Sequence, residues 1–520
     1  MLIVACLILG ISSQGGTPKL GAGLEGIGGR GLEFVDVMKT ARPWETLDGR
    51  PAKVDASGWP LEDARTVAFD MRPTFAWAPP MDDPSGYQID VSGRYSLSFK
   101  GKADLSAGED PNSFRIENQQ FNAATVETTA ELVVPKGRAL VIINFRNTDN
   151  GVKNVRLLRP GYARDGKSLF TKPFLAAIKQ FPAMRFMDWL QSNGTNPFFG
   201  DAKNTTEWSD RHVPADAHFG VAGRKFGVPW EYIVALGNQT QKDIWINIPV
   251  AASDDYIRQL AKLMKRDLNP KLNIYLEYSN EVWNWGFLQA TYNRMAAEAE
   301  VKAGKSNLNN DGETNWDVWR RRRHARRTME IGQIFASEFG KDQLNKRLRP
   351  VMAWWVIAPD HYADMLAWLE KTYGPPRNYL HAVAAAPYFN IHGAPKDASV
   401  DVLIAHFRKS SDSSVPHRKA MIDIARKYGL KAFCYEGGSD TGGGDPANVA
   451  NRIRAERDPR MKDLILHDLR DNWYALGGDL FMYFTLSSAY SRYGCWGLTD
   501  DITKLDTPKF QAAREILTGN

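Results

Sequence analysis

The chain has 520 residues, a formal net charge of +6 and 43% hydrophobic residues. This length exceeds one ordinary domain, and the composition excludes a disordered or fibrous protein. The small positive charge does not favour nucleic-acid binding, whereas 16 Trp, 18 Tyr and 24 Phe are typical of proteins that hold sugars against flat rings.

The chain begins with an apolar run, residues 1–16, which ends in small polar residues. The run is too short to span a bilayer and has the make-up of an export signal. We therefore expect a secreted, periplasmic or extracellular protein. No basic segment precedes the run, which leaves open the alternative that it is not a signal.

The cysteines predict at most one disulfide and no metal site. Cys6 would leave with the signal, and Cys434 and Cys495 allow one disulfide at most. Neither has the Cys or His spacing of a metal site. The fold is therefore not expected to depend on cysteine chemistry. The sequence also has no Walker or HExxH motif, and neither a metal ion nor an organic cofactor is expected.

Residues 17–54 are expected to hold the first strand of a barrel, at Leu32–Met38, and the loop after it. In residues 55–160 the apolar positions alternate with a period of two, as in Arg94–Lys100, which predicts an antiparallel β-sandwich. If Leu32–Met38 is the first barrel strand, the sandwich is inserted after it, on the face that such loops build. Otherwise the sandwich is an N-terminal module.

Residues 161–520 alternate short apolar runs with longer helical stretches. This alternation predicts a parallel sheet, and the number of units indicates an α/β fold, a (β/α)8 TIM barrel. A dense basic run, Trp319–Arg327, is interpreted as a solvated helix face rather than an anion site. The strand-like runs are Met184–Asp188, Asp243–Pro249, Leu272–Tyr278, Pro350–Ile357, His381–Tyr388, Lys431–Glu436 and Gly478–Thr485.

Two of these runs lead to a glutamate. Asn280 and Glu281 follow Leu272–Tyr278, and Glu436 ends its strand before a pair of glycines. Hydrolysis of a glycosidic bond needs two carboxyl groups beside the anomeric carbon, one to protonate the leaving oxygen and one to attack or to activate water. Because the C-terminal ends of barrel strands converge, Glu281 and Glu436 are a candidate catalytic pair.

With Asn-Glu after the fourth strand and Glu at the end of the seventh, the sequence resembles the clan A glycoside hydrolases, which include many cellulases, mannanases and xylanases. The resemblance implies that Glu281 is the general acid/base and Glu436 the nucleophile. It also implies that Asn280 binds the sugar 2-hydroxyl, that Arg185 keeps the nucleophile ionised, and that Tyr388 donates to it. A plain core tyrosine is the alternative for Tyr388.

The sequence departs from the clan pattern in two places. Many members carry a His near the end of the third strand, and Asn247–Val250 has none. A Trp often follows the eighth strand; here that role is unassigned between Phe484 and Trp496.

Glu277 competes with Glu281, because it lies on the same strand with the same parity and could be a structural charge paired with a basic group. Glu281 is preferred because it is nearer the strand's C-terminal end and follows Asn280. Aromatic residues after strands are candidate sugar platforms, with ordinary packing as the alternative. They are Trp44, Trp189, Trp283, Trp285 and Trp496.

Together these features predict a retaining glycoside hydrolase of β-linked glycans, with endo-β-1,4-glucanase-like activity as the first choice. One alternative is an exo-acting or arabinofuranosidase-type enzyme, which would have a blocked pocket instead of a through cleft. Another is a catalytically inactive carbohydrate-binding protein on the same fold. The expected partner is a polysaccharide or oligosaccharide, and neither nucleic acid nor stable membrane insertion is expected.

Overall fold

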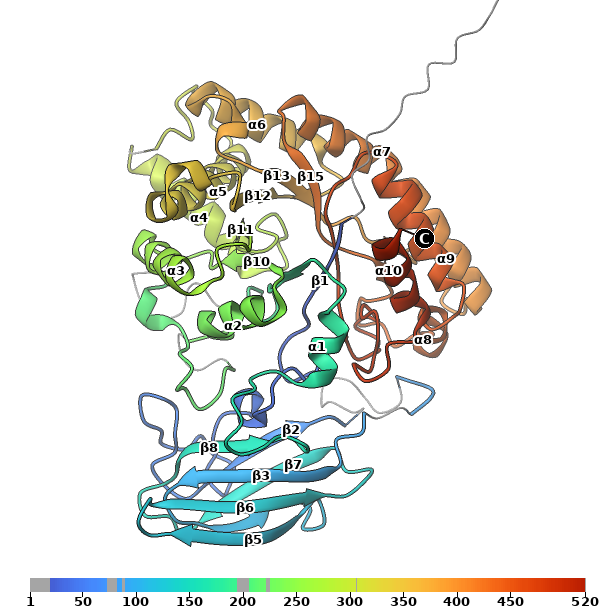
Figure 1. The fold of residues 1–520 in the computed structure, drawn as a ribbon. Coiled ribbons are helices and arrows are strands. Elements are labelled where there is room, and N and C mark those ends of the chain that lie inside the picture. Colours follow the sequence, from blue (N-terminus) through green and yellow to red (C-terminus); the bar gives the residue numbers. More distant parts are fainter. Residues whose placement is uncertain are drawn as a thin grey trace, which may run out of the picture.

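The computed structural model describes residues 19–72, 82–86, 89–193, 205–220, 225–304 and 306–519. Figure 1 shows a barrel surrounded by helices, with a separate stack of antiparallel strands beneath it. The expected export signal, residues 1–16, lies outside the described residues.

Within the described residues, eight parallel strands close the barrel. The first strand pairs with both the second and the eighth, which completes the ring. The predicted (β/α)8 barrel is therefore confirmed. In chain order the strands are β1 (Leu20–Gly23), β9 (Ala183–Arg185), β10 (Asp243–Ile248), β11 (Ile274–Tyr278), β12 (Leu348–Ala353), β13 (Ala382–Ala385), β15 (Lys431–Gly437) and β17 (Phe481–Tyr483).

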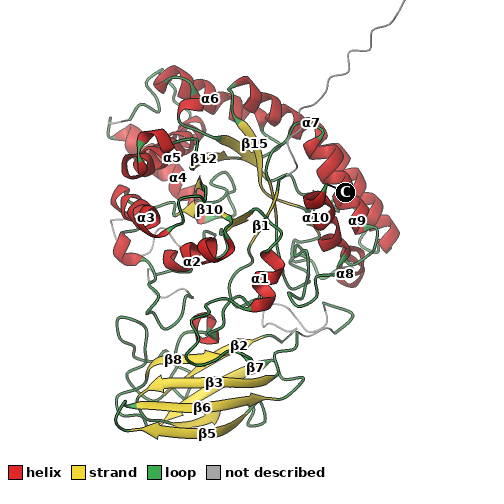
Figure 2. Cartoon of the chain, in the orientation of Figure 1, coloured by secondary structure: helices red, strands yellow, loops and turns green. Residues whose placement is uncertain are grey.

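Helices cover the outside of the barrel (Figure 2). Several begin at a hydroxyl cap: Ser253 accepts a hydrogen bond from the Tyr256 amide, and Thr507 from the Phe510 amide. The helices are α1 (Lys172–Ile178), α2 (Trp230–Thr240), α3 (Asp254–Asp267), α4 (Leu288–Lys302), α5 (Trp316–Phe339), α6 (Pro359–Tyr373), α7 (Val400–Lys427), α8 (Val449–Glu456), α9 (Met461–Leu469) and α10 (Pro508–Thr518). Two short strands, β14 (Phe389–Asn390) and β16 (Ser439–Asp440), pair beyond β13 and β15.

The barrel interior combines small and large side chains. Trp245, Tyr275 and Phe433 pack together, with ring centroids of neighbouring pairs 5.4–6.0 Å apart. On the opposite side, Met482 fills the space beside β1, where a Cβ on Gly21 would lie 2.3 Å from its sulfur. Because the large residues already fill the lumen, the facing positions of β1 have to be glycine.

The expected first strand, Leu32–Met38, is wrong. The first barrel strand is β1, and Leu32–Met38 makes only isolated bridges, to Phe170 and Leu158, before a short 3-10 helix at Val37–Thr40. β1 reads Leu-Gly-Ala-Gly, so it has no apolar run that would mark it as a strand in the sequence.

The antiparallel strands form what we call the β-domain, which lies in the chain between β1 and β9. One sheet has the order β2 (Ala64–Asp70), β7 (Leu140–Arg146), β4 (Asp104–Ala107), and the other β5 (Arg115–Asn122), β6 (Glu127–Val134), β3 (Gly93–Lys100), β8 (Lys153–Leu158). The sheets pack face to face, with Phe69 stacked on Tyr95 at 5.7 Å and Phe99 edge-on to Phe145 at 5.3 Å. Alternating buried residues along β6 produce the period of two seen in the sequence.

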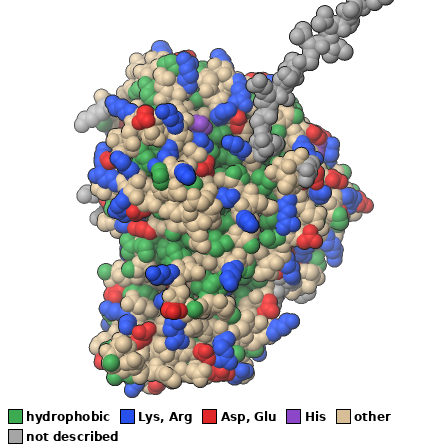
Figure 3. Space-filling view, viewed as in Figure 1, with side chains coloured by type: hydrophobic (Ala, Val, Ile, Leu, Met, Phe, Trp, Pro, Cys, Tyr) green, Lys and Arg blue, Asp and Glu red, His purple; other side chains and the backbone are tan. Residues whose placement is uncertain are grey.

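Backbone hydrogen bonds join the β-domain to the barrel. Arg159 N donates to Val35 O at 3.0 Å, and Ala217 N donates to Ser57 O at 2.9 Å. On the face drawn in Figure 3, hydrophobic side chains gather where the two parts meet. The β-domain is thus fixed against the barrel.

The basic run Trp319–Arg327 lies on α5, and its interpretation as a solvated face is wrong. Arg320 and Arg322 are only 5% and 6% exposed. Arg322 donates to both carboxylate oxygens of Asp311 at 2.8 Å, and Arg323 to Glu300 at 2.9 Å. The arginines therefore tie α5 to its neighbours through paired charges.

Cys434 and Cys495 are both buried and free. Among the described residues, no helix combines the length and apolarity that a membrane span requires, and no group of three or more His, Cys, Asp or Glu side chains is arranged to hold a metal ion.

Candidate active site

The two candidate glutamates lie at the C-terminal mouth of the barrel. Glu281 follows β11 and Glu436 ends β15, and they are 9% and 6% exposed. Ser279 and Glu281 have φ angles of +59° and +43°, unusual for residues other than glycine. Such strained backbone persists where the surroundings hold it and is common at functional sites.

An irregularity in β15 directs Glu436 toward the mouth. Tyr435 faces the barrel interior beside Phe433, so strict alternation would turn the next residue outward. The register between β15 and β17 shifts between Cys434 and Gly437. Such a bulge re-aims a side chain, and it allows neighbouring Tyr435 and Glu436 both to serve the site.

Arg185, at the end of β9, connects the site. Its Nη1 donates to Glu436 Oε2 at 2.8 Å, and its Nη2 donates to Asn280 Oδ1 at 2.7 Å. The guanidinium also holds Glu277 with two bonds of 3.0 Å. Although burial alone would lower the pKa of Arg185, the carboxylates of Glu277 and Glu436 raise it, so the side chain remains a cation.

Glu277 is completely buried in the barrel interior. Besides its two bonds to Arg185, it accepts a hydrogen bond from Trp245 Nε1 at 2.7 Å. It is therefore a structural charge that orients Arg185 and has no exposed surface for a substrate.

Glu281 has polar partners but no directly bound cation among the described residues. Its Oε1 is 3.0 Å from the Tyr435 hydroxyl, and its Oε2 accepts from Asn284 Nδ2 at 2.9 Å. Burial, followed by the negative charge of Glu436, raises the pKa of Glu281 to about 8. One guanidinium thus serves Glu277 and Glu436, while Glu281 keeps its proton near neutral pH.

Asn280 and Tyr388 both lie at the same mouth. Asn280 is completely buried and, besides its bond to Arg185, donates to Asn193 Oδ1 at 3.0 Å. The Tyr388 ring packs edge-on against Phe484, with ring centroids 6.2 Å apart. Burial, then the charge of Glu436, raises the pKa of Tyr388. Within the described part of the chain, however, its hydroxyl makes no hydrogen bond to Glu436.

Three of the predicted tryptophans lie at this mouth. Trp283, after β11, stacks on Trp355 with ring centroids 5.2 Å apart and planes 7° apart. Trp285 is 50% exposed, and Trp496 donates its Nε1 to Asp440 at 3.0 Å while lining a cavity.

The other two tryptophans are core residues, so their assignment as sugar platforms is wrong. Trp189 is completely buried and stacks on Phe170 and Phe174. Trp44 is 4% exposed and packs against Phe145 of the β-domain. Trp44 lies after the 3-10 helix Val37–Thr40 and Trp189 after β9, and both side chains point into the core instead of lining the mouth.

Some site residues were not expected from the sequence. Tyr435 and Asn284 bind Glu281, and Asn193 binds Asn280. Tyr435 could have been suspected because it directly precedes Glu436. At the position where clan members often carry a His, Asn247 donates to Ser279 O at 2.7 Å and so supports the turn that leads to Glu281.

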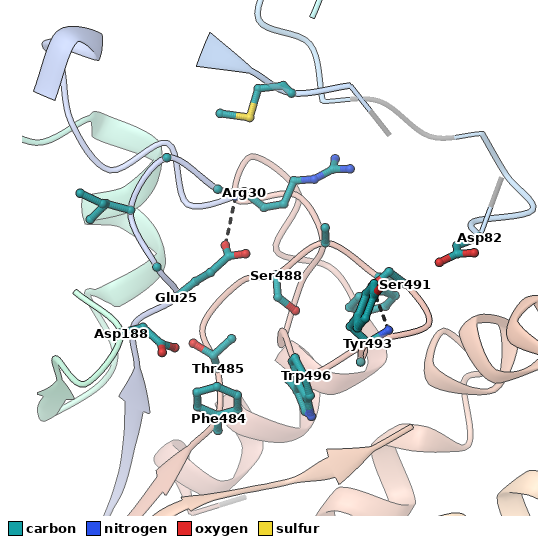
Figure 4. Close-up of a pocket in the computed structure, with 18 of the residues that line it drawn as sticks. Glu25, Arg30, Asp82, Asp188, Phe484, Thr485, Ser488, Ser491, Tyr493 and Trp496 are labelled. Atoms are coloured by element: carbon teal, nitrogen blue, oxygen red, sulfur yellow. Dashed lines mark hydrogen bonds between the residues drawn. The ribbon is translucent and has the colours of Figure 1, made fainter. Parts of the chain in front are cut away.

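A cavity of about 710 Å³ lies beside the glutamates and is drawn in Figure 4. The loops after β1, β9 and β17 and the edge of the β-domain line it. Glu281 and Glu436 are not among its lining residues, but Phe484 packs edge-on against Tyr388 at 6.2 Å and Asn193 contacts Asn280. The cavity therefore adjoins the mouth of the barrel where the two glutamates lie.

No family model and no curated protein matches the chain. The fold is similar to solved glycoside hydrolases of clan A. A GH51 arabinofuranosidase from Xanthomonas axonopodis pv. citri is 13% identical with a TM-score of 0.42, covering 68% of this chain and 67% of that one. Xylanase10C from Cellvibrio japonicus is 11% identical with a TM-score of 0.36, covering 93% and 99%. A Bacteroidetes-affiliated GH5 cellulase is 12% identical with a TM-score of 0.36, covering 70% and 87%. Similarity at this level concerns the fold alone, so the function has to be inferred from the site's own residues.

Proposed function

We propose that the protein is a retaining glycoside hydrolase of β-linked glycans, with Glu436 as nucleophile and Glu281 as general acid/base. The observation that carries this proposal is the unequal charge environment of the two carboxyl groups. Arg185 binds Glu436 directly, whereas Glu281 is buried without a cation and has a raised pKa. Double displacement requires one carboxyl group that attacks the anomeric carbon and another that gives its proton to the leaving oxygen.

In the first step Glu436 attacks the anomeric carbon while Glu281 gives its proton to the glycosidic oxygen. The bond from carbon to that oxygen breaks, the alcohol leaves, and a glycosyl ester on Glu436 forms. Arg185 holds Oε2 of Glu436, so Oε1 is the oxygen that attacks. The resemblance assigns the sugar 2-hydroxyl to Asn280, which is completely buried and held by Arg185 and Asn193; a contact of this kind strengthens in the transition state.

In the second step Glu281, now a carboxylate, removes a proton from water. The water oxygen bonds to the anomeric carbon, the ester bond to Glu436 breaks, and the sugar leaves with its original configuration. Tyr435 and Asn284 hold the Glu281 carboxyl group in place through both steps. The Tyr435 hydroxyl can donate or accept, so it tolerates both protonation states of Glu281.

The test is turnover of aryl β-glycosides and of soluble β-glucan, mannan and xylan by wild type and Glu436→Ala. We expect the variant to lose at least about ten-thousandfold in kcat, and azide to restore activity with formation of a glycosyl azide of inverted configuration. Asp342→Asn is the matched control, because Asp342 is exposed and precedes β12 at the opposite end of the barrel. Inversion by wild type in an NMR product assay would overturn the retaining mechanism.

The alternative of an inactive carbohydrate-binding protein is favoured by one observation, the asparagine at position 247 where many clan members have a histidine. Binding of a glycan by wild type without turnover of any substrate in the panel would establish that alternative. Endo-β-1,4-glucanase-like activity and export remain predictions from the sequence, and the panel tests the first of them.

A further inference from the structure

The cavity drawn in Figure 4 lies at one end of the barrel mouth, as its lining residues show. Its walls come from the loops after β17, β1 and β9, which are neighbouring strands in the ring. The loops after β11 and β12, which carry Glu281 and the Trp283–Trp355 stack, lie across the ring from β17 and β1. Cavity and tryptophan stack are thus at opposite ends of the mouth.

The two ends of a substrate can be assigned to these sides. An acid/base protonates the departing oxygen, so the leaving part of the glycan lies against the loop that carries Glu281. That loop carries Trp283, which stacks on Trp355 through one face, and the half-exposed Trp285, over which Arg320 lies at 4.5 Å. The opposite face of each ring suits a sugar. The cavity then receives the other part, the glycone, which becomes attached to Glu436.

The β-domain forms the far wall of the cavity. Asp70, Met71 and Arg72 at the end of β2 contribute to it, as do Asp82 and Asp83. Two ion pairs hold this wall to the barrel: Arg492 with Asp82, and Arg457 with Asp83. A long glycan extending from the catalytic pair through the cavity would meet these residues.

The carboxyl groups inside the cavity suit neutral hydroxyl groups. Asp188 has no side-chain partner in the described part of the chain, and Glu25 accepts one bond, from Arg30 N at 3.0 Å. In Figure 4 these two lie across the cavity from Tyr493 and Trp496. Burial raises the pKa of Glu25 well above its usual range and, with the charge of Glu436, that of Asp188 to about 7, so both can donate as well as accept.

Both arginines among the described residues that line the cavity, Arg30 and Arg72, lie near acidic side chains. Arg72 is bound by Asp70 through two bonds of 2.8 Å, and Arg30 lies next to Glu25, whose pKa it lowers in part. A uronate carboxylate would be placed among Glu25, Asp188 and the charge of Glu436. A neutral sugar is therefore the better match.

We propose that this cavity is a glycone subsite closed by the β-domain, in which Glu25 and Asp188 bind the hydroxyl groups of a neutral sugar, so that the enzyme cleaves short units from a chain end. The inference rests on the proposed function and adds that the enzyme acts at the non-reducing end of the glycan. It reverses the preference for endo action that the sequence suggested.

The first experiment follows the products from cellopentaose, xylopentaose and mannopentaose labelled at the reducing end. We expect the hydrolysed oligosaccharide to lose a short unlabelled sugar from its non-reducing end, with labelled products shortening stepwise. Viscosity of the matching polysaccharide should fall only in proportion to the reducing sugar released. Internal cleavage, with rapid loss of viscosity, would overturn this inference and leave the proposed function intact, whereas failure to hydrolyse any substrate would overturn the proposed function first.

The second experiment tests the hydroxyl contacts with Glu25→Gln and Asp188→Asn on the best aryl β-glycoside. Each should raise KM, or lower kcat/KM, by about tenfold to a hundredfold, with the same loss for good and poor leaving groups, because the contacts are to the glycone. Asp342→Asn should change neither constant. Unchanged kinetics in both variants, or hydrolysis of the aryl β-glucuronide as fast as of the neutral glycosides, would overturn the proposal.

Discussion

At the residue scale, the site contains three buried carboxyl groups and one arginine that binds two of them. Arg185 contacts Glu277 and Glu436, and the third group, Glu281, is buried without its own cation. Burial, followed by the negative charge of Glu436, raises the pKa of Glu281 to about 8, and no cation bound to Glu281 opposes this rise. The same environment leads to two predictions.

The first prediction concerns pH. Glu281 must be protonated to act as the acid, and its pKa is raised to about 8, so kcat/KM should be maintained up to neutral pH and fall tenfold per pH unit above about 8. The measurement is a pH profile on a substrate whose leaving group needs protonation. The Glu281→Gln variant is assayed with a dinitrophenyl glycoside, whose leaving group needs no protonation. Its pH profile should have no alkaline limb, because the titrating group has been removed. An alkaline limb below pH 6 would contradict the assignment of Glu281.

The second prediction concerns Glu277→Gln. Arg185 and Glu277 are almost completely buried, and removal of one charge from a buried pair typically costs about 3–5 kcal/mol. We expect a loss of about 3 kcal/mol in the free energy of unfolding, measured with urea, and a fall in kcat, because Arg185 loses the partner that orients it. Asp342→Asn should leave both unchanged. Wild-type stability of Glu277→Gln would show that Glu277 is not ionised in the folded protein.

The clan resemblance implied that Arg185 lies beside Glu436. Residue types and strand ends were enough to predict Glu281 and Glu436 at the mouth. They also predicted that Glu277 could be a structural charge. They failed for Trp44 and Trp189, because position after a strand does not show whether a loop folds back into the core. Asn284 was missed because its role depends on the turn of positive φ through Glu281, which no sequence pattern marks.

At the element scale, strands with clear apolar runs were predicted and β1 was not. A buried strand is recognised by branched and aromatic residues, yet β1 consists of Leu-Gly-Ala-Gly because side chains from other strands, such as Met482, already occupy the lumen. The bulge of β15 could not be predicted from the sequence either, because it depends on the pairing of β15 with β17. The glycines of β1 and the bulge of β15 are therefore both consequences of tertiary packing.

The third prediction tests the end of β15. Gly438 has a φ of +134°, and a Cβ there would lie 2.7 Å from the Tyr483 ring. Gly438→Ala should lower the free energy of unfolding by about 3 kcal/mol, through backbone strain and overpacking together, and should lower kcat by displacing Glu436. Gly393→Ala is the control: its φ is +80°, but a Cβ would meet nothing within 4 Å, so only the backbone cost, about 1 kcal/mol, is expected. Equal losses in the two variants would show that contact with Tyr483 is unimportant.

At the scale of the whole molecule, the β-domain belongs to the active-site face. Its strands lie in the chain between β1 and β9, and loops after barrel strands build the face where the strands end. The sequence indicated antiparallel strands in this region from their period of two. For a sandwich inserted after the first barrel strand, it also indicated a position on this face. It could not indicate which residues make the contact, because ion pairs such as Arg457–Asp83 join residues far apart in the chain.

The fourth prediction tests this connection through Arg457, which follows α8 and binds both Asp83 of the β-domain segment and Asp500 of the barrel. Arg457→Ala should release the far wall of the cavity while leaving Glu281, Glu436 and Arg185 in place. We expect KM for short neutral glycosides to rise about tenfold with kcat little changed, since a contact that is equal in ground and transition states alters only binding. Arg454→Ala, one helical turn earlier and exposed, contacts only Asn451 among the described residues and should match wild type. A fall in kcat without a change in KM would contradict the prediction, because it would mean that Arg457 acts on the catalytic pair and not on the wall.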